Sequence, residues 1–241
     1  MYLQHLKFEA LATTSAGFAF SRGRQDGAVL REEMLAHIRE IVDATLLPVN
    51  ADFQSGYADQ PEDLGANVKL CIATGVAGLS IEDNTGRTDA PLYETDLAVE
   101  RIRAARNAID ASAIPIVLTG RCEAWLVGQS DPFHVAIERL VAYAAAGADC
   151  LYAPGVSEPK EIAEIVRAVA PKPLNVLVSG FNHHLSVSQL SDLGVRRISV
   201  GSSLALVAWN AFIRAARSLN SGSFNALADA THSAELNKLF S

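Results

Sequence analysis

Four acidic residues lie at or just after short apolar runs, in positions where they could hold a hard metal ion. Asp52 follows "TLLPVN", Glu82 and Asp83 end "VAGLSIED", and Asp26 lies in the loop "SRGRQDG". Mg2+ prefers carboxylate oxygens and keeps several of its waters, so it needs few protein ligands. These four residues are therefore the predicted metal ligands. The alternative is that they are solvated loop acids or helix caps.

A permanent cation and a group of small polar residues accompany these acids. Arg121 directly follows the apolar run "IPIVLTG", where it could bind a carboxylate or stabilise an oxyanion. A salt bridge to Glu123 or Glu82 is the alternative role. The segment "TTSAG" offers hydroxyl and backbone N–H groups to a carboxylate or phosphate, and Asn50 lies two residues before Asp52.

Short apolar runs recur along the chain and predict seven strands. They are Glu9–Ser15, Thr45–Asn50, Val76–Asp83, Ile114–Arg121, Ala148–Gly155, Pro173–Gly180 and Val195–Ser202. Segments with helical periodicity lie between them, and several begin on Asp, Pro or Glu and end on Gly. Regular alternation without a linker predicts a single α/β domain, residues 1–241, with a parallel sheet.

The sequence favours a closed (β/α)8 barrel over an open doubly wound sheet, because no GxGxxG follows the first strand. Barrel enzymes carry their active sites at the C-terminal ends of the strands, which is where the polar residues above occur. An eighth strand is not found. The start "MYLQHL" reads as the end of a helix whose preceding strand would lie upstream, so we expect a barrel without its first strand.

Composition narrows the class of partner. The chain has 241 residues, is 49% hydrophobic and carries a net charge of −7, which argues against nucleic-acid and anionic-membrane surfaces. Three widely spaced cysteines without CxxC suit a reducing compartment, and no apolar run reaches membrane length. We expect a cytoplasmic protein with a small-molecule ligand.

Five segments, taken in chain order, resemble the isocitrate lyase/phosphoenolpyruvate mutase superfamily, and most closely its short bacterial members. They are "PVNADFQSGYA", "GVAGLSIEDN", "IVLTGRCEAWLVG", "AIERLVAYAAAGADCLYAPG" and "LGVRRISVGSSLA". The resemblance implies a Mg2+-dependent (β/α)8 barrel, with Mn2+ as the alternative ion. It also implies the making or breaking of a C–C or C–P bond beside a 2-oxo acid, through an enolate-like pyruvyl intermediate.

Residue roles can be transferred from the same resemblance. It implies that Asp52, Glu82 and Asp26 hold Mg2+ or its waters, and that Arg121 binds the substrate and its developing negative charge. It further implies that a run of four residues cradles the pyruvyl carboxylate, namely Thr14, Ser15, Ala16 and Gly17.

Three departures from the family pattern restrict the reaction. Asn50 stands where the family usually has the first Asp of a DxD motif, which exchanges an anionic ligand for a neutral one. The loop "NTGRTDAPLYE" lacks the KKCGH-like motif whose Cys acts in isocitrate and methylisocitrate lyases, so we do not expect those two activities. The lysine- and asparagine-bearing loop of the phosphonomutases is not evident either.

The leading hypothesis is a Mg2+-dependent lyase, cleaving a C–C bond or decarboxylating a small 2-oxo or 2-hydroxy carboxylate, with Arg121, Asp52 and Glu82 as catalytic residues. The alternatives are a C–P mutase or hydrolase, a barrel isomerase that binds phosphate at "VGSSLA", and an inactive homologue that binds a 2-oxo acid. The amphipathic C-terminal segment, about residues 203–241, is expected to pack on a second subunit of a homodimer or homotetramer. A helix covering its own barrel is the alternative.

Overall fold

The computed structural model describes residues 2–180 and 182–240, and in them strands alternate with helices. The strands are β1 (Leu11–Ala12), β2 (Val49–Asp52), β3 (Gly78–Glu82), β4 (Val117–Arg121), β5 (Cys150–Tyr152), β6 (Leu174–Leu177) and β7 (Arg197–Ser199). The helices are α1 (Tyr2–His5), α2 (Ser15–Ser21), α3 (Arg31–Asp43), α4 (Pro61–Ile72), α5 (Thr95–Ser112), α6 (Pro132–Ala145), α7 (Pro159–Val169), α8 (Val187–Asp192), α9 (Ser203–Asn220) and α10 (Ser233–Leu239). Six of the strands lie inside predicted runs, and β2 begins inside the run Thr45–Asn50 but extends two residues beyond it, to Asp52.

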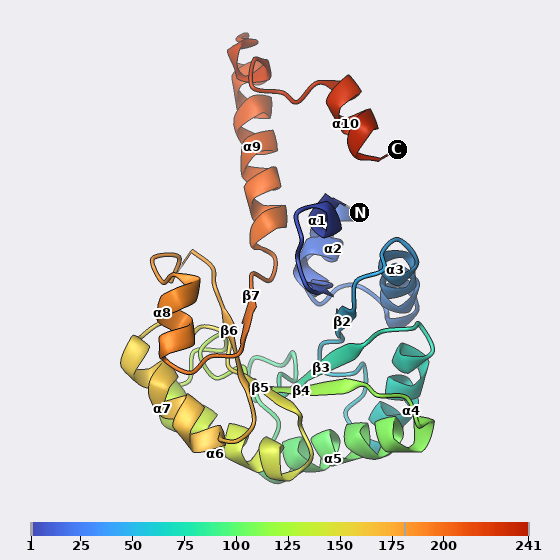
Figure 1. Cartoon of the computed structure of the whole chain (residues 1–241), viewed down its shortest axis with the longest axis vertical. Helices are drawn as coiled ribbons and strands as arrows, with labels where there is room; N and C mark the ends of the chain where they lie inside the picture. The colour runs from blue at the N-terminus through green and yellow to red at the C-terminus, as the bar shows by residue number, and fades with distance from the viewer. Residues whose placement is uncertain (1, 181, 241) are drawn as a thin grey trace.

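The strands form one parallel sheet in which each pairs with the next along the chain, from β1 to β7. The sheet curves into a nearly closed barrel with α4 to α7 around its outside (Figure 1). No pairing between β1 and β7 occurs within residues 2–180 and 182–240. The predicted α/β barrel with seven strands is therefore confirmed for this part of the chain.

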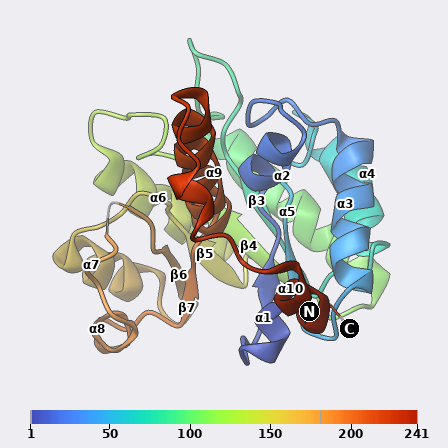
Figure 2. The same cartoon turned by 90° about the horizontal axis from the view of Figure 1, so that it is seen from above.

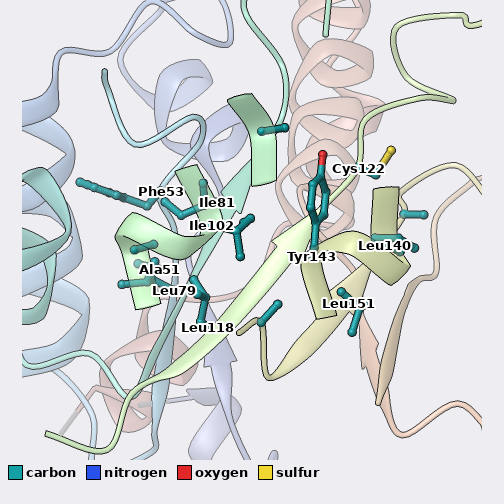
Figure 3. Packing of buried hydrophobic residues seen from close by; sticks show 14 of the residues in the cluster. Ala51, Phe53, Leu79, Ile81, Ile102, Leu118, Cys122, Leu140, Tyr143 and Leu151 are labelled. Atoms are coloured by element: carbon teal, nitrogen blue, oxygen red, sulfur yellow. The ribbon is translucent and has the colours of Figure 1, made fainter. Parts of the chain in front are cut away.

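The apolar core lies between the strands and the surrounding helices. Leu79, Leu118 and Leu151 are fully buried on their strands, because alternate strand residues point outward toward the helices. Figure 3 shows Ile81 and Ile102 in the same apolar layer. Each such side chain stabilises the fold by about 1.5–3 kcal/mol when it is fully buried.

Polar side chains at strand positions are joined across the sheet. Arg197 Nη1 of β7 donates to Thr119 Oγ1 of β4 at 3.0 Å, although these strands are not neighbours. Asn175 Nδ2 of β6 donates to Ser199 Oγ at 3.0 Å. Barrel interiors are more often filled by branched apolar residues, so these hydrogen bonds give the inside of this barrel an unusual polar layer.

The loop between β2 and α4 is tied down from α5 by one buried arginine. Arg101 is 1% exposed and donates to the backbone carbonyl oxygens of Ser55, Ala58 and Asp59. Its guanidinium carbon lies 4.0 Å from the ring centroid of Tyr93, whose hydroxyl donates to Asp59 Oδ1. The loop therefore has a defined path although it has no regular secondary structure.

The two ends of the chain extend beyond the barrel. The segment "TTSAG" is not an open loop, because Thr14 caps α2 and its Oγ1 accepts from Gly17 N at 3.3 Å.

Toward the C-terminus α9 projects away from the sheet (Figures 1 and 2), and none of its residues is buried. Within the described residues, no helix is long and apolar enough to cross a membrane.

Replacement of Arg101 by Leu should lower the free energy of unfolding by about 3 kcal/mol or more, because it leaves buried carbonyl oxygens without donors. Urea denaturation followed by circular dichroism measures the change. The matched control is Arg103→Leu on the same helix, where the side chain is half exposed and pairs with Glu100. That variant should differ from wild type by less than about 0.5 kcal/mol, and equal losses in both variants would contradict the assigned role.

Candidate active site at the strand ends

Three of the predicted site residues are the last residues of three neighbouring strands. Asp52 ends β2, Glu82 ends β3 and Arg121 ends β4. The parallel register pairs Glu82 directly with Arg121 and places Asp52 beside Ser80. The carboxyl ends of parallel strands meet at one edge, so the fold brings these three side chains together, as the sequence predicted.

Arg121 is at the centre of this group, which we call the rim site. Its Nη1 lies 3.3 Å from Asp52 Oδ1 and 3.4 Å from Glu82 Oε2. Its Nε donates to Glu123 Oε1 at 2.5 Å, and its guanidinium carbon lies 5.2 Å from the ring centroid of Tyr152. One guanidinium therefore binds carboxylates from three points of the chain.

The rim site contains more negative than positive charge. Three carboxylates surround one guanidinium, which gives a formal charge of −2 when all are ionised. Burial raises the pKa of Glu82 well above its ordinary value, and the attraction of Arg121 does not offset this. Burial alone would lower the pKa of Arg121, but the surrounding carboxylates outweigh it and raise that pKa, so the guanidinium stays charged.

The start of α2 is fastened to β2 beside the rim site. Ser15 N donates to Asp52 Oδ2 at 2.9 Å, and Asp52 N donates to Thr13 Oγ1 at 2.9 Å. Of the predicted carboxylate cradle, Ser15 N and Gly17 N are thus used within the protein. The Ala16 N–H and the Ser15 hydroxyl are two groups of this turn that are candidates for binding an anionic ligand.

Asp83 and Asp26 do not join the rim site. Asp83 is 2% exposed, and its oxygens accept from Glu123 N at 2.8 Å, Tyr143 OH at 2.6 Å and Arg139 Nη1 at 3.1 Å. It therefore holds the adjacent backbone from the helix side of the sheet. Asp26 lies in an exposed loop and accepts from Gly27 N at 3.0 Å. Their roles as metal ligands stay predictions.

The residues present fit a hydrated divalent cation better than a fully protein-ligated one. Within residues 2–180 and 182–240, no group of three or more His, Cys, Asp or Glu side chains is arranged to hold a metal ion. Mg2+ needs only one or two carboxylates because it retains waters, and Asp52 and Glu82 supply these. Asn50 Oδ1 adds a buried oxygen that has no hydrogen-bond partner in the described structure. The excess negative charge favours such an ion.

From the sequence, Glu123 is expected only as an alternative salt-bridge partner of Arg121, yet it makes the shortest of the three carboxylate contacts with Arg121. Its position two residues after Arg121 was the available signal, since the chain leaves the strand there. Tyr152 ends β5 beside Arg121 and is not among the site residues predicted from the sequence. An aromatic ring against a guanidinium cannot be inferred from spacing alone.

In metal-free protein, Glu82→Gln should be more stable than wild type at pH 8. The pKa of Glu82 is raised in the folded state. The protonated carboxyl therefore contributes to the stability of the fold below the ordinary pKa, and this contribution is lost as the pH rises toward the raised pKa. Each unit of elevation corresponds to about 1.4 kcal/mol. Melting temperatures measured with EDTA from pH 4.5 to 8 should therefore converge at the acidic end.

The exposed Glu138→Gln on α6 controls for loss of a surface carboxylate. A Glu82→Gln variant that is less stable than wild type at every pH would show instead that the attraction to Arg121 dominates.

Comparison with known proteins gives a consistent assignment. The family model described as phosphoenolpyruvate phosphomutase matches residues 1–220. The chain is 33% identical over 164 residues to 2-methylisocitrate lyase of Escherichia coli strain K12, covering 64% of this chain and 53% of that protein. It thus spans about half the length of that enzyme.

Two solved structures extend the likeness over the whole fold. A putative lyase/mutase from Burkholderia cenocepacia J2315 superposes with a TM-score of 0.95 at 46% identity, covering 99% of this chain and 86% of the other. Oxaloacetate acetylhydrolase in complex with the product oxalate gives a TM-score of 0.85 at 26% identity, covering 98% and 82%. The motifs, the barrel and the family match together show that the chain belongs to the phosphoenolpyruvate phosphomutase family, within the isocitrate lyase/phosphoenolpyruvate mutase superfamily.

Proposed function

We propose that this protein is a divalent-metal-dependent lyase that cleaves a C–C bond of, or decarboxylates, a small 2-oxo or 2-hydroxy carboxylate through an enolate-like pyruvyl intermediate. The observation that carries the proposal is the rim site, where Arg121 contacts Asp52, Glu82 and Glu123 at the ends of neighbouring strands. Mg2+ is the proposed ion, and Mn2+ is the alternative.

The chain's own groups suit this chemistry. Cleavage of a bond beside a carbonyl leaves negative charge on the carbonyl oxygen, and the permanently charged Arg121 can stabilise it. A bound divalent ion would supply further positive charge at the same place. Asp52 and Glu82 would hold that ion or its waters, with Asn50 as a neutral oxygen donor. The turn from Thr14 to Gly17, beside Asp52, would orient the substrate carboxylate.

The relatives support the same class of reaction. Those named above include a 2-methylisocitrate lyase and an oxaloacetate acetylhydrolase in complex with its product oxalate. Oxalate resembles a pyruvate enolate in shape and charge, which makes it a suitable probe for this chain. An inactive homologue that binds 2-oxo acids is the second candidate, favoured by Asn50 in place of an acidic ligand.

Mg2+ and oxalate together should raise the melting temperature, whereas either alone should have a smaller effect. At about 100 times its Kd a ligand stabilises the native state by about 2.7 kcal/mol. For a chain of this size that corresponds to roughly 5 to 10 °C. Differential scanning fluorimetry measures the shift.

Asp52→Asn should abolish the joint shift, because it keeps an acceptor for Ser15 N but removes the charge. Asp96→Asn, exposed in the first turn of α5, is the matched control and should retain it. A wild-type protein that shows no shift with both ligands would refute the metal-lyase proposal. Binding without turnover of any 2-oxo acid would favour the inactive homologue.

We also propose that α9 packs against a second copy of the chain in a homo-oligomer. Its exposed apolar side chains include Val207, which is 68% exposed, and Phe212, which is 63% exposed. The helix projects from the barrel rather than covering it, so the alternative of a cover within its own subunit finds no support among the described residues (Figure 1). A helix this apolar is more stable when it is buried.

The double variant Val207→Asp/Phe212→Asp should convert the oligomer to a monomer, because it places charges on the proposed interface. Size-exclusion chromatography with light scattering measures the mass. Asn210→Asp, at another exposed position on the same helix, should leave the mass unchanged. A monomeric wild-type protein would contradict the proposal.

A further inference from the structure

One residue near the rim site has a backbone conformation and a hydroxyl group that the fold alone does not explain. Tyr57 lies in the loop between β2 and α4 with φ of 57°, and Gln54 in the same loop has φ of 50°. Left-handed backbone is unusual for a bulky aromatic residue and costs of order 1–3 kcal/mol. Such strain persists only where the surroundings impose it.

The surroundings do impose it, through contacts on both sides of the loop. Asn67 Nδ2 of α4 donates to Gly56 O at 2.8 Å and to Tyr57 O at 3.2 Å. Arg101 holds the carbonyl oxygens on either side, as described above. The Tyr57 ring packs edge-on against Phe53, with ring centroids 5.3 Å apart. The direction of the Tyr57 side chain is therefore fixed.

This fixed side chain ends in a buried hydroxyl that has no hydrogen-bond partner in the described structure. The other buried tyrosine hydroxyls of this region are satisfied, since Tyr93 OH donates to Asp59 and Tyr143 OH donates to Asp83. A buried hydroxyl without a partner loses its hydration with nothing in return. Strain and an unpaired polar atom thus coincide in one residue.

The loop that carries Tyr57 lies beside the predicted site, because it begins directly after Asp52 and Glu82 N donates to Gln54 O of this loop at 3.0 Å. Burial raises the pKa of the Tyr57 phenol, and the charges of Asp52, Glu82 and Asp26 raise it further, in that order. The phenol is thus neutral at physiological pH and has a proton to donate. It makes no bond to these carboxylates, although it lies within reach of their charges.

We propose that Tyr57 is a substrate-binding residue of the rim site, whose hydroxyl donates a hydrogen bond to an anionic oxygen of the bound carboxylate or enolate. This inference rests on the proposed function. The Tyr57 hydroxyl requires as its partner an acceptor oxygen of a small ligand bound beside Asp52 and Glu82. A phenol donor complements Arg121, because it carries no charge and its directional hydrogen bond would orient the same ligand oxygen.

The test is Tyr57→Phe, which removes only the oxygen atom. Isothermal titration calorimetry of oxalate in the presence of Mg2+ should show a ten- to hundredfold weaker Kd than wild type. The melting temperature of the ligand-free variant should be unchanged or higher, since an unpaired buried hydroxyl has been removed. The shift produced by Mg2+ alone should stay as in wild type.

The matched control is Tyr93→Phe, which removes a hydroxyl that is paired inside the protein. It should lose stability and keep its oxalate affinity. Equal oxalate affinity in Tyr57→Phe and wild type would overturn the inference while leaving the proposed function intact. Loss of stability in the free Tyr57→Phe variant would also overturn it, because the role would then be structural. A wild-type protein that binds no oxalate would overturn both proposals.

Discussion

The arrangement of charge around Arg121 is the constraint on which the rim site depends. A guanidinium that contacts three carboxylates at 2.5 to 3.4 Å joins the ends of β2, β3 and β4 with the turn that follows β4. The carboxylates outnumber the cation when all are ionised, and burial makes that excess charge costly, which is why the pKa values of Glu82 and Glu123 are raised. A site of this kind can bind a cation through its carboxylates, and Arg121 can bind an anionic group of a ligand.

A second layer of buried arginines supports this arrangement from the helix side. Arg101 fixes the loop after β2, and Arg139 binds Asp83 beside the turn after β4. These side chains make their bonds mainly to backbone and to buried acids, so they set positions rather than take part in chemistry. The rim site therefore depends on α5 and α6 as much as on the strands.

Much of this organisation could be predicted from the sequence. Apolar runs and helical periodicity located all seven strands, and the polar residues at the strand ends identified Asp52, Glu82 and Arg121. The placement of Asp83 did not follow from its position near a strand end. Alternation along a strand was the available signal, because neighbouring residues point to opposite sides of the sheet and Glu82 and Asp83 are then separated. The left-handed backbone of Tyr57 depends on Asn67 and Arg101, which are distant in sequence, and spacing does not reveal such contacts.

The hydrogen bond between Arg197 and Thr119 also links β7, at one edge of the sheet, to β4 in its middle. Arg197 begins β7, the strand that leads into α9, and Thr119 lies two residues before Arg121 on β4. Since β7 is an edge strand in the described sheet, its backbone pairs there with β6 alone, and Arg197 adds a side-chain attachment to β4. One side chain therefore joins the strand that leads into α9 to the strand that carries Arg121.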